Sequence, residues 1–571
     1  MDRIKFVFSI TFMFSLLFSI CPYMCGEIFN AAAEEHIKNL VLTTMECRHV
    51  PGFTLSVVKG GDVWARGFGR ADISAGVPVD NSTLFAIGSV TKSFTMVLLG
   101  ILLTEKKLDW TAKVMEILGP EYGFVDEYRT RESTLKDLLS HRTGLDGHEF
   151  GVISGYPETV SREELSKNLK FLPEKKAFRD GFIYNNYMYM LLGHVAEKLG
   201  GETWENLITS RVLTPIGMSS SKLLKQPSDV FIYGVAQPYI LRDGQFANGT
   251  RSIYTIRPME PSGAILSNGV DMAKYIRFII NMGKTDKGEQ LLDTELLKQA
   301  FIGIISDTSD NYRTNFFLTQ PTFPAFEIPL GYGHAFTEAF YNGNRRVDHS
   351  GGVFSYITLL WIFPDQHIGI FASTNGPAVN ALQMKALTTT FYHVSDILLG
   401  YKPWINVTNA CTFPGPWRND TVTEFGAGEI SRELRNAKEY TGFYGNNVLS
   451  GIHVESDDKS NTSLKFTMGL LNGYLQSTTD HDRFMMEIMS PAEFYAPFMD
   501  KNNVTMKFHV TFLRYNNECT LLQLHFNMPL NFTKQGYITS TRGQAVNNGQ
   551  GLTTSINCVI SVLAYSFANN P

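Results

Sequence analysis

The chain has few cysteines and little net charge. Each of these features argues against particular classes of protein or binding site. Six cysteines in 571 residues, with no C-x-x-C and no H-E-x-x-H, support neither a disulfide scaffold nor a metal site, and we expect no cofactor. The net charge is only −5 and no lysine-rich run occurs, which argues against a nucleic-acid partner. G-x-S-x-G is also absent, which argues against the nucleophile elbow of the α/β-hydrolases.

The two ends of the chain carry apolar segments. Arg3 and Lys5 precede an apolar stretch, Phe6 to Ile20, that is short for a membrane-spanning helix, so we predict a signal peptide over residues 1–25. The alternative is an uncleaved anchor. The apolar tail at 546–571 is a frayed tail or a final β element, or else a lipid-anchor signal. We therefore expect a secreted, extracellular protein without membrane attachment.

Glycosylation and disulfide signals agree with a secretory route. The chain has seven N-x-[ST] sequons, which are predicted glycosylation sites: Asn81, Asn248, Asn406, Asn419, Asn461, Asn503 and Asn531. Four cysteines remain beyond the predicted signal and allow one or two disulfides in any of three pairings: Cys47, Cys411, Cys519 and Cys558.

The first motif with chemical meaning begins at Ser89, in Ser89-Val90-Thr91-Lys92. It stands where a strand-like run, Leu84 to Gly88, enters an apolar helix, Phe94 to Leu103. Residues i and i+3 share a helix face, so the Lys92 amine would lie beside the Ser89 hydroxyl. The helix dipole and burial both disfavour an ammonium there, so we expect an amine able to take the serine proton. The same S-x-x-K pattern occurs where a solvated lysine is the ordinary interpretation: at Ser56, Ser133, Ser219 and Ser456.

The second motif is Tyr184-Asn185-Asn186, at the start of an amphipathic helix that ends at Gly200-Gly201. A loop-to-helix junction lets the side chains of Tyr184 and Asn186 point into a cleft. Tyrosine acts as a base only beside a positive charge, which Lys92 would supply. Taken alone, Tyr184 is better explained as a core aromatic.

The third motif is His349-Ser350-Gly351-Gly352, followed by a predicted strand pair, Ser355 to Phe363 and Ile368 to Ser373. Glycines in a strand allow a ligand to approach the backbone closely. The amides of Gly352 and Ser89 are therefore candidates for an oxyanion hole. Taken alone, His349 is better explained as a hydrogen-bonded histidine at a strand edge.

The ordered motifs S-x-x-K, Y-x-N and H-x-G resemble the serine β-lactamase-related family, which includes class C β-lactamases, D-Ala-D-Ala carboxypeptidases and related esterases. The resemblance spans about residues 30 to 400. Further segments that resemble family landmarks are Thr134 to Leu145 (TLKDLLSHRTGL), Leu213 to Met218 (LTPIGM), Pro261 to Ser267 (PSGAILS), Gly331-Tyr332-Gly333 and Phe363-Pro364-Asp365.

The resemblance implies roles for matching residues. Ser89 would be the acylated nucleophile, Lys92 its activating amine and Tyr184 the general base and later acid. Asn186 would orient the substrate, and Gly351 and Gly352 would line the substrate-binding site. His349 would also contact substrate, but it stands where classical members carry the lysine of K-[ST]-G, which puts β-lactamase activity itself in doubt.

The expected fold is a β-lactamase/transpeptidase-like α/β sandwich. We predict an antiparallel sheet from Phe53 to Val58, Val63 to Gly67 and the strands after His349, covered by helices at Ala31 to Cys47 and Ala378 to Leu399. A mostly helical lobe from about 105 to 300 would carry Tyr184. The expected division is a signal at 1–25, a catalytic domain at 26–400, a linker at 401–434, a small β-barrel-like domain at 435–545 and a tail at 546–571.

Two functions fit these observations. The first is a secreted serine hydrolase acting through an acyl-enzyme on a small peptide-like amide or ester. The second is a non-catalytic extracellular protein that keeps the fold as a scaffold, with matrix partners, as in mollusc shell-matrix relatives of the gigasin type. Retention of Ser89, Lys92, Tyr184 and Asn186 together favours the enzyme, since a scaffold needs none of them.

Overall fold

A computed structural model describes residues 27–147, 149–225, 233–242, 244–249, 256–306, 323–377, 382–417, 434, 436–489, 506–515, 518–525 and 529–534. The predicted signal peptide and the predicted tail lie outside these residues. Within the described part of the chain, no helix is both long enough and apolar enough to cross a bilayer.

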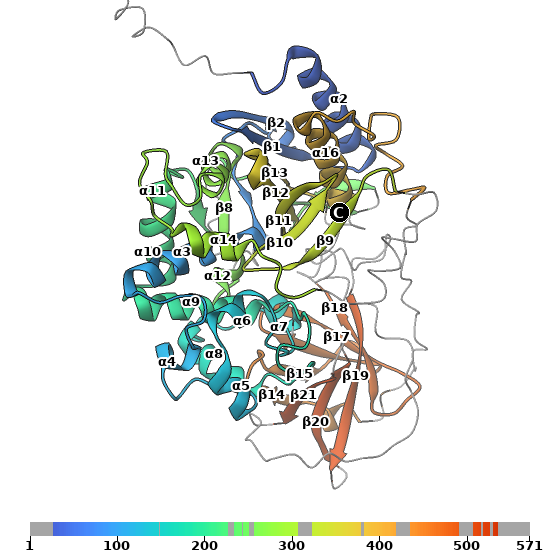
Figure 1. Cartoon of the computed structure of the whole chain (residues 1–571). Coiled ribbons are helices and arrows are strands. Elements are labelled where there is room, and N and C mark those ends of the chain that lie inside the picture. The colour runs from blue at the N-terminus through green and yellow to red at the C-terminus, as the bar shows by residue number, and fades with distance from the viewer. Residues whose placement is uncertain are drawn as a thin grey trace, which may run out of the picture.

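An eight-stranded sheet forms the middle layer of the larger unit (Figure 1), in the order β3-β2-β1-β13-β12-β11-β10-β9. Strand β1 (Gly52–Lys59) pairs with β13 (Ile368–Thr374), so the N-terminal hairpin adjoins strands from the far end of the unit. All neighbouring strands in this sheet are antiparallel, as predicted. The remaining strands are β2 (Asp62–Asp72), β3 (Val77–Pro78), β9 (Glu327–Tyr332), β10 (Thr337–Tyr341), β11 (Asn344–Val353) and β12 (Tyr356–Phe363).

Helices cover both faces of this sheet. The predicted N-terminal helix is α2 (Ala31–Cys47), and it packs with α16 (Leu382–Leu399) over β12 and β13. Helix α13 (Gly269–Ile280) packs on β1 and β13 from the other side. Central strands covered on both faces read as continuous apolar runs, and β12 and β13 are buried at every position. The predicted α/β sandwich is confirmed.

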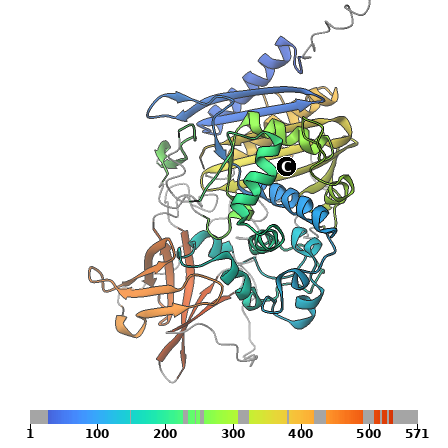
Figure 2. The ribbon, with the colours of Figure 1, turned by 90° about the vertical axis from the view of Figure 1, so that its left-hand side faces the viewer.

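The lobe predicted to be mostly helical is confirmed, and Figure 2 shows its helices beside the sheet. Its central helix α3 (Thr91–Lys106) is buried from Thr91 to Leu103, as expected of a helix that is apolar on all sides. The other helices are α4 (Val114–Leu118), α5 (Glu127–Glu132), α6 (Leu135–Leu139), α7 (Glu149–Ser154), α8 (Arg162–Asn168), α9 (Asn186–Gly200), α10 (Trp204–Ile208), α11 (Thr214–Ile216), α12 (Glu260–Gly263) and α14 (Thr294–Ala300). Short strands complete it: β4 (Phe85–Ala86), β5 (Lys222–Leu223), β6 (Tyr239–Arg242), β7 (Gln245–Asn248) and β8 (Ile265–Ser267).

The C-terminal β domain is a separate closed barrel of eight strands, β14 to β21. Its inward-facing side chains are buried and apolar, including Phe466, Phe484 and Phe512, so packed side chains occupy the interior. The strand predicted at Ser463 to Met468 is β16, with the same bounds. The other strands are β14 (Gly442–Gly445), β15 (Ile452–Ser456), β17 (Leu471–Ser477), β18 (Arg483–Ile488), β19 (Met506–Tyr515), β20 (Glu518–His525) and β21 (Pro529–Lys534).

The barrel packs against the segment that follows α7. The Leu470 amide donates to the Ser154 carbonyl at 2.6 Å, and the Tyr156 hydroxyl donates to the Val448 carbonyl at 2.9 Å. The Tyr156 hydroxyl also lies 2.7 Å from the hydroxyl of Tyr187 in α9. Hydrogen bonds through Tyr156 therefore link the barrel to α9, the helix that begins at the Tyr184 motif.

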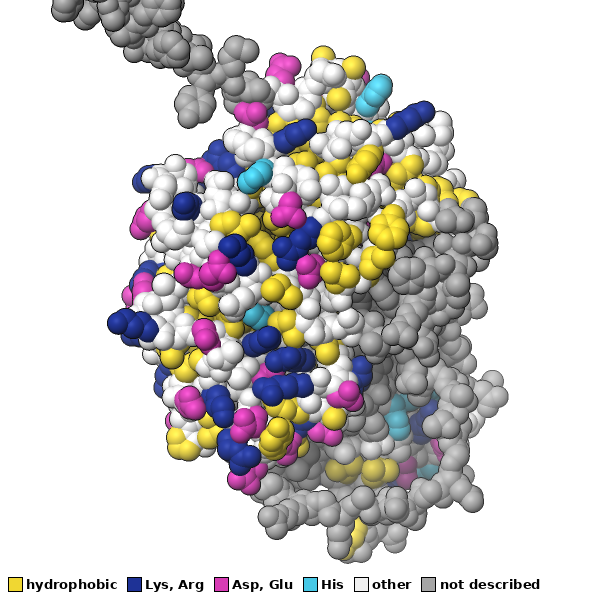
Figure 3. All heavy atoms as spheres, viewed as in Figure 1, with side chains coloured by type: hydrophobic (Ala, Val, Ile, Leu, Met, Phe, Trp, Pro, Cys, Tyr) yellow, Lys and Arg dark blue, Asp and Glu magenta, His cyan; other side chains and the backbone are white. Residues whose placement is uncertain are grey.

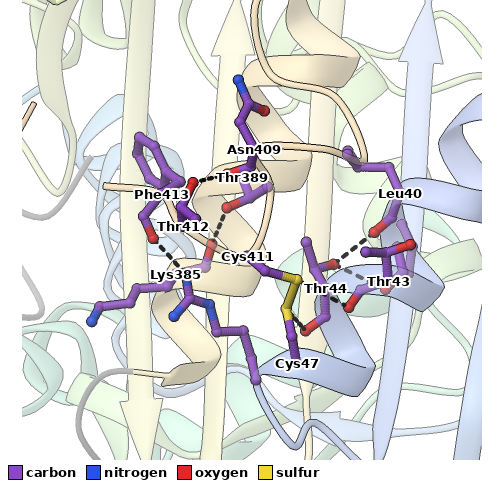
Figure 4. Close-up of a disulfide and its surroundings, with 12 residues drawn as sticks. Leu40, Thr43, Thr44, Cys47, Lys385, Thr389, Asn409, Cys411, Thr412 and Phe413 are labelled. Carbon is purple, nitrogen blue, oxygen red and sulfur yellow. Dashed lines mark hydrogen bonds between the residues drawn. A yellow bond between two sulfur atoms is a disulfide. The ribbon is translucent and has the colours of Figure 1, made fainter. Parts of the chain in front are cut away.

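Residues 401–417, which lie in the predicted linker at 401–434, contain side chains that pack on the larger unit. Ile405, Ala410 and Phe413 are buried against α16, because this segment carries apolar side chains among its Asn, Thr and Pro residues. A disulfide between Cys47 and Cys411 ties the segment to the end of α2 (Figure 4). Residues 401–417 of the predicted linker thus pack on the larger unit, and the proposed domain boundaries stay predictions.

The disulfide resolves a pairing that the sequence left open. Cys47 and Cys411 are 364 residues apart and meet only because α2 and α16 pack together. Cys519 is a buried free thiol in β20, and Cys558 lies outside the described residues.

Candidate active site

Ser89 lies in a short 3-10 turn, Gly88–Val90, between β4 and α3. The α-helix begins at Thr91, so Ser89 precedes the helix rather than lying in its first turn as predicted. The i, i+3 contact survives, because a 3-10 turn places residues three apart in line. Gly88 has φ +51°, and a Cβ there would lie 2.6 Å from the Gly352 amide nitrogen. Position 88 therefore requires glycine, and its backbone brings Ser89 against β11.

Lys92 is fully buried at the base of the site. Its Nζ donates to Ser89 Oγ at 3.1 Å, to Asn186 Oδ1 at 2.6 Å and to the Ser262 carbonyl at 2.9 Å. These acceptors come from the Gly88–Val90 turn, α9 and α12, so tertiary packing fixes the amine beside the serine. Asn186 thus positions Lys92, a role that the motif alone did not reveal.

Tyr184 is the second side chain, after Lys92, that contacts the Ser89 hydroxyl. Its hydroxyl donates to Ser89 Oγ at 2.8 Å, and Lys92 Nζ lies 4.9 Å from the centre of its ring. Helix α9 begins directly after it, and the Asn185 side chain caps that helix by accepting from the Tyr187 amide. The structure therefore brings Ser89, Lys92, Tyr184 and Asn186 together, while their chemical roles stay predictions.

The glycines of the third motif allow β11 to approach the serine closely. A Cβ on Gly351 would lie 2.0 Å from the Ile87 carbonyl oxygen and 3.2 Å from the Ser89 nitrogen. The Gly352 backbone passes equally close to Gly88. This is the backbone approach that an oxyanion hole made of the Ser89 and Gly352 amides needs.

His349 is buried in β11 with both ring nitrogens bonded. Its Nδ1–H donates to the Ser350 carbonyl, and its Nε2 accepts from the Tyr332 hydroxyl at 2.9 Å. Burial, and then the charge of Lys92, lower the pKa of His349 to about 3. The ring is neutral at neutral pH, so this position lacks the positive charge that a lysine would supply. Contact between His349 and substrate stays a prediction.

Three buried residues beside the site had no predicted role. Tyr332 bonds His349, Tyr189 has its ring centre 5.2 Å from Lys92 Nζ, and His141 lies against the ring of Tyr184. Burial is the main cause that raises the pKa of both Tyr189 and Tyr332 well above 10, so both remain neutral phenols. Tyr332 and His141 fall in segments that resemble family landmarks, which was the only sequence signal that pointed to them.

Most of the predicted glycosylation sites lie in the part of the chain that the structure describes. Five of the seven asparagines are described, and all five are exposed, as an attached glycan requires: Asn81, Asn248, Asn406, Asn461 and Asn531. The two others, Asn419 and Asn503, lie outside the described residues.

Figure 3 shows acidic and basic side chains interspersed over the described surface of the face that it draws, in line with the small net charge.

Comparison with known proteins identifies the fold. The sequence profile of the family described as Beta-lactamase matches residues 37–389, which is more than half of the chain and includes Ser89, Tyr184 and His349. The chain belongs to the beta-lactamase family. The β-lactamase/transpeptidase-like fold predicted from the motifs is thereby confirmed.

Individual relatives of this beta-lactamase-family chain are distant. It is 26% identical to the unguisins hydrolase ungD of Aspergillus violaceofuscus over 57% of this chain and 58% of that protein, so the match spans less than two thirds of the relative. It is 28% identical to gigasin-6 of Magallana gigas over 41% of this chain and 78% of that protein. Its fold is similar to that of an octameric penicillin-binding protein homologue from Pyrococcus abyssi, with a TM-score of 0.52 and 20% identity, over 88% of this chain and all of that one. The family supports a serine-hydrolase-like protein in general terms.

Proposed function

We propose that this protein is a secreted serine hydrolase that cleaves an amide or ester through an acyl-enzyme on Ser89. The observation that carries the proposal is the position of Ser89 Oγ, 3.1 Å from Lys92 Nζ and 2.8 Å from the Tyr184 hydroxyl. A serine hydroxyl is a weak nucleophile unless an adjacent group accepts its proton. Two such groups contact this hydroxyl, and β11 lies beside it.

The reaction would proceed in two halves. In the reactive form, Tyr184, held beside Lys92, has released its proton and accepts that of Ser89 while Oγ attacks the substrate carbonyl carbon. The amides of Ser89 and Gly352 would hold the resulting oxyanion. Tyr184 then returns the proton to the leaving amine or alcohol, which leaves an ester on Ser89. Water attacks that ester and gives a proton to Tyr184, which passes it to the departing Ser89 Oγ. The acid product leaves, the Ser89 hydroxyl is restored, and Tyr184 is again without its proton.

The neutral His349 supports a substrate without an anionic group at this position. A carboxylate moved from water against a buried neutral imidazole would lose hydration and gain no opposite charge from residue 349 itself. An ester or amide with a neutral substituent has no such cost. We therefore propose small peptide-like esters and amides as substrates, in preference to β-lactams, which carry a carboxylate.

Secretion is part of the proposal and rests on other observations. Residues 1–25 have the pattern of a signal peptide, and the described sequon asparagines are exposed. The Cys47–Cys411 disulfide also fits an oxidising compartment. Release of the protein into the medium with N-linked glycans would support it, whereas retention in the cytosol without glycans would contradict it.

Covalent labelling by a fluorophosphonate tests the catalytic part. Ser89→Ala should abolish labelling of the full-length protein. Ser219→Ala is the matched control, because Ser219 also begins an S-x-x-K pattern, is exposed, and should leave labelling intact. Labelling that persists without Ser89 would place the nucleophile elsewhere.

The likeness to gigasin-6 keeps a second candidate in view, a non-catalytic extracellular protein on the same fold. That candidate predicts no labelling of the wild-type chain and no turnover of a broad ester and amide panel. The enzyme predicts both.

A further inference from the structure

His141 lies directly beneath the proposed base, although it touches neither Ser89 nor a substrate carbonyl position. Its ring centre is 4.4 Å from that of Tyr184, and it is fully buried. The rings of Phe182, Tyr189 and Tyr332 surround it at 5.6, 5.2 and 5.0 Å. His141 is therefore enclosed with Tyr184 on one side and core aromatics on the others.

Two hydrogen bonds join His141 to the residues on either side of Tyr184. The Ile183 amide donates to the His141 carbonyl oxygen at 2.9 Å. The Asn185 amide donates to His141 Nδ1 at 3.1 Å. One residue thus holds the backbone immediately before and immediately after Tyr184, which limits rotation of the Tyr184 side chain relative to Ser89.

His141 ends helix α6 as a left-handed cap: the His141 amide donates to the Leu138 carbonyl at 3.2 Å and the Arg142 amide donates to the Asp137 carbonyl at 3.1 Å. Its φ is +55°, in the left-handed region that a histidine occupies at a cost. Because Nδ1 accepts a hydrogen bond, the proton of the neutral ring is on Nε2, and this buried Nε2 has no hydrogen-bond partner among the described residues. Burial, and then the charge of Lys92, hold the pKa of His141 well below 6.5. The ring therefore keeps its acceptor at Nδ1 over the working pH range.

We propose that His141 is a positioning residue for Tyr184, acting through its Nδ1 acceptor on the Asn185 amide. This inference rests on the proposed function, since it assigns a task to Tyr184. Catalysis depends steeply on placement, and a displacement of about 1 Å can lower the rate about 100-fold.

Two substitutions separate the acceptor from the ring. His141→Asn keeps an acceptor at the same position along the side chain, since Asn Oδ1 corresponds to His Nδ1, and asparagine tolerates φ > 0. His141→Gly also tolerates φ > 0 but has no acceptor. Both remove the ring, so both should lower the melting temperature, and only His141→Asn keeps an acceptor for the Asn185 amide.

The full-length variants are assayed with p-nitrophenyl butyrate and by hydrogen exchange of a peptide that contains residues 183–187. We expect His141→Asn to keep kcat within about threefold of the wild type and the exchange slow. We expect His141→Gly to lower kcat roughly 10- to 100-fold with little change in KM and to speed exchange at the Asn185 amide. If His141→Gly does not fold, His141→Phe, which keeps a ring and removes the acceptor, takes its place.

The outcomes distinguish the two proposals. If the wild type is active but the glycine and asparagine variants have equal kcat and equal exchange, the positioning role of His141 is wrong and the hydrolase remains. If the wild type hydrolyses nothing and Ser89 is not labelled, the proposed function is wrong, and the role assigned to His141 falls with it. Slow exchange that depends on the acceptor would then report a purely structural bond.

Discussion

Replacing Tyr184 by phenylalanine removes one hydroxyl from the proposed site and little else. The lost bond is the one to Ser89 Oγ at 2.8 Å, and the Ser89 hydroxyl keeps its contact with Lys92. The ring retains its packing on His141. One neutral hydrogen bond contributes about 1 kcal/mol, so the melting temperature should fall by only about 2–4 °C.

The effect on turnover should be much larger. A positioned acid–base group contributes roughly 10²–10⁴ in rate, which corresponds to about 3–5 kcal/mol of transition-state stabilisation. Tyr184→Phe should therefore lower kcat by that factor, measured on a panel of chromogenic esters and D-amino-acid amides. The loss in catalysis would exceed the loss in folding free energy about three- to fivefold.

Tyr275→Phe is a matched control inside the same protein. The Tyr275 hydroxyl also donates to a serine, Ser93 Oγ, at 2.8 Å, and Tyr275 is also buried, in α13. This variant should lose similar stability and keep its turnover. Equal kcat in the two variants, or a kcat of Tyr184→Phe that matches the wild type, would refute Tyr184 as the base.

Three further predictions concern Lys92, His334 and the disulfide between Cys47 and Cys411. Lys92→Met should lower turnover about as much as Tyr184→Phe, and the double variant should cost little more, because members of one catalytic unit are not additive; additive losses in single and double variants would contradict this. Burial lowers the pKa of His334 to about 3, so the unfolded chain binds a proton that the folded chain does not, and this stability is lost as the pH falls below about 6.5. His334→Phe should therefore reduce the drop in unfolding free energy between about pH 6.5 and 4.5 by about 2 kcal/mol in urea titrations, and an unchanged drop would show that His334 does not titrate this way. Cys411→Ser should cost about 2–5 kcal/mol, because the disulfide closes a loop of 364 residues, and a variant whose melting temperature equals that of the oxidised wild type would contradict a stabilising bridge.

Local signals in the sequence determined the elements that carry the site. The helix at Ala31–Cys47 and the strand at Ser463–Met468 have the predicted bounds, because period and end signals act over a few residues. The Tyr184 motif was placed at a helix start for the same reason, and Asn185 caps that helix. The order of the three motifs was enough to predict the fold that the family match confirms.

Tertiary structure alone decided which of these residues meet. Lys92 and Asn186 are 94 residues apart, and no spacing rule links them. The same holds for Cys47 with Cys411 and for His141 with Tyr184, which are in contact only because segments far apart in the sequence pack together. Long-range contacts depend on how buried faces fit each other, and a single sequence does not state this.

Burial also decided properties that residue types leave open. A histidine in a motif can be charged or neutral, and it is the closed surroundings of His349 that make it neutral. Residues 401–417 look like a linker by composition, yet Ile405 and Phe413 are buried because α16 offers them an apolar surface. The sequence by itself determined the chemical groups and their order, and the packed structure determined their distances, their protonation and their partners.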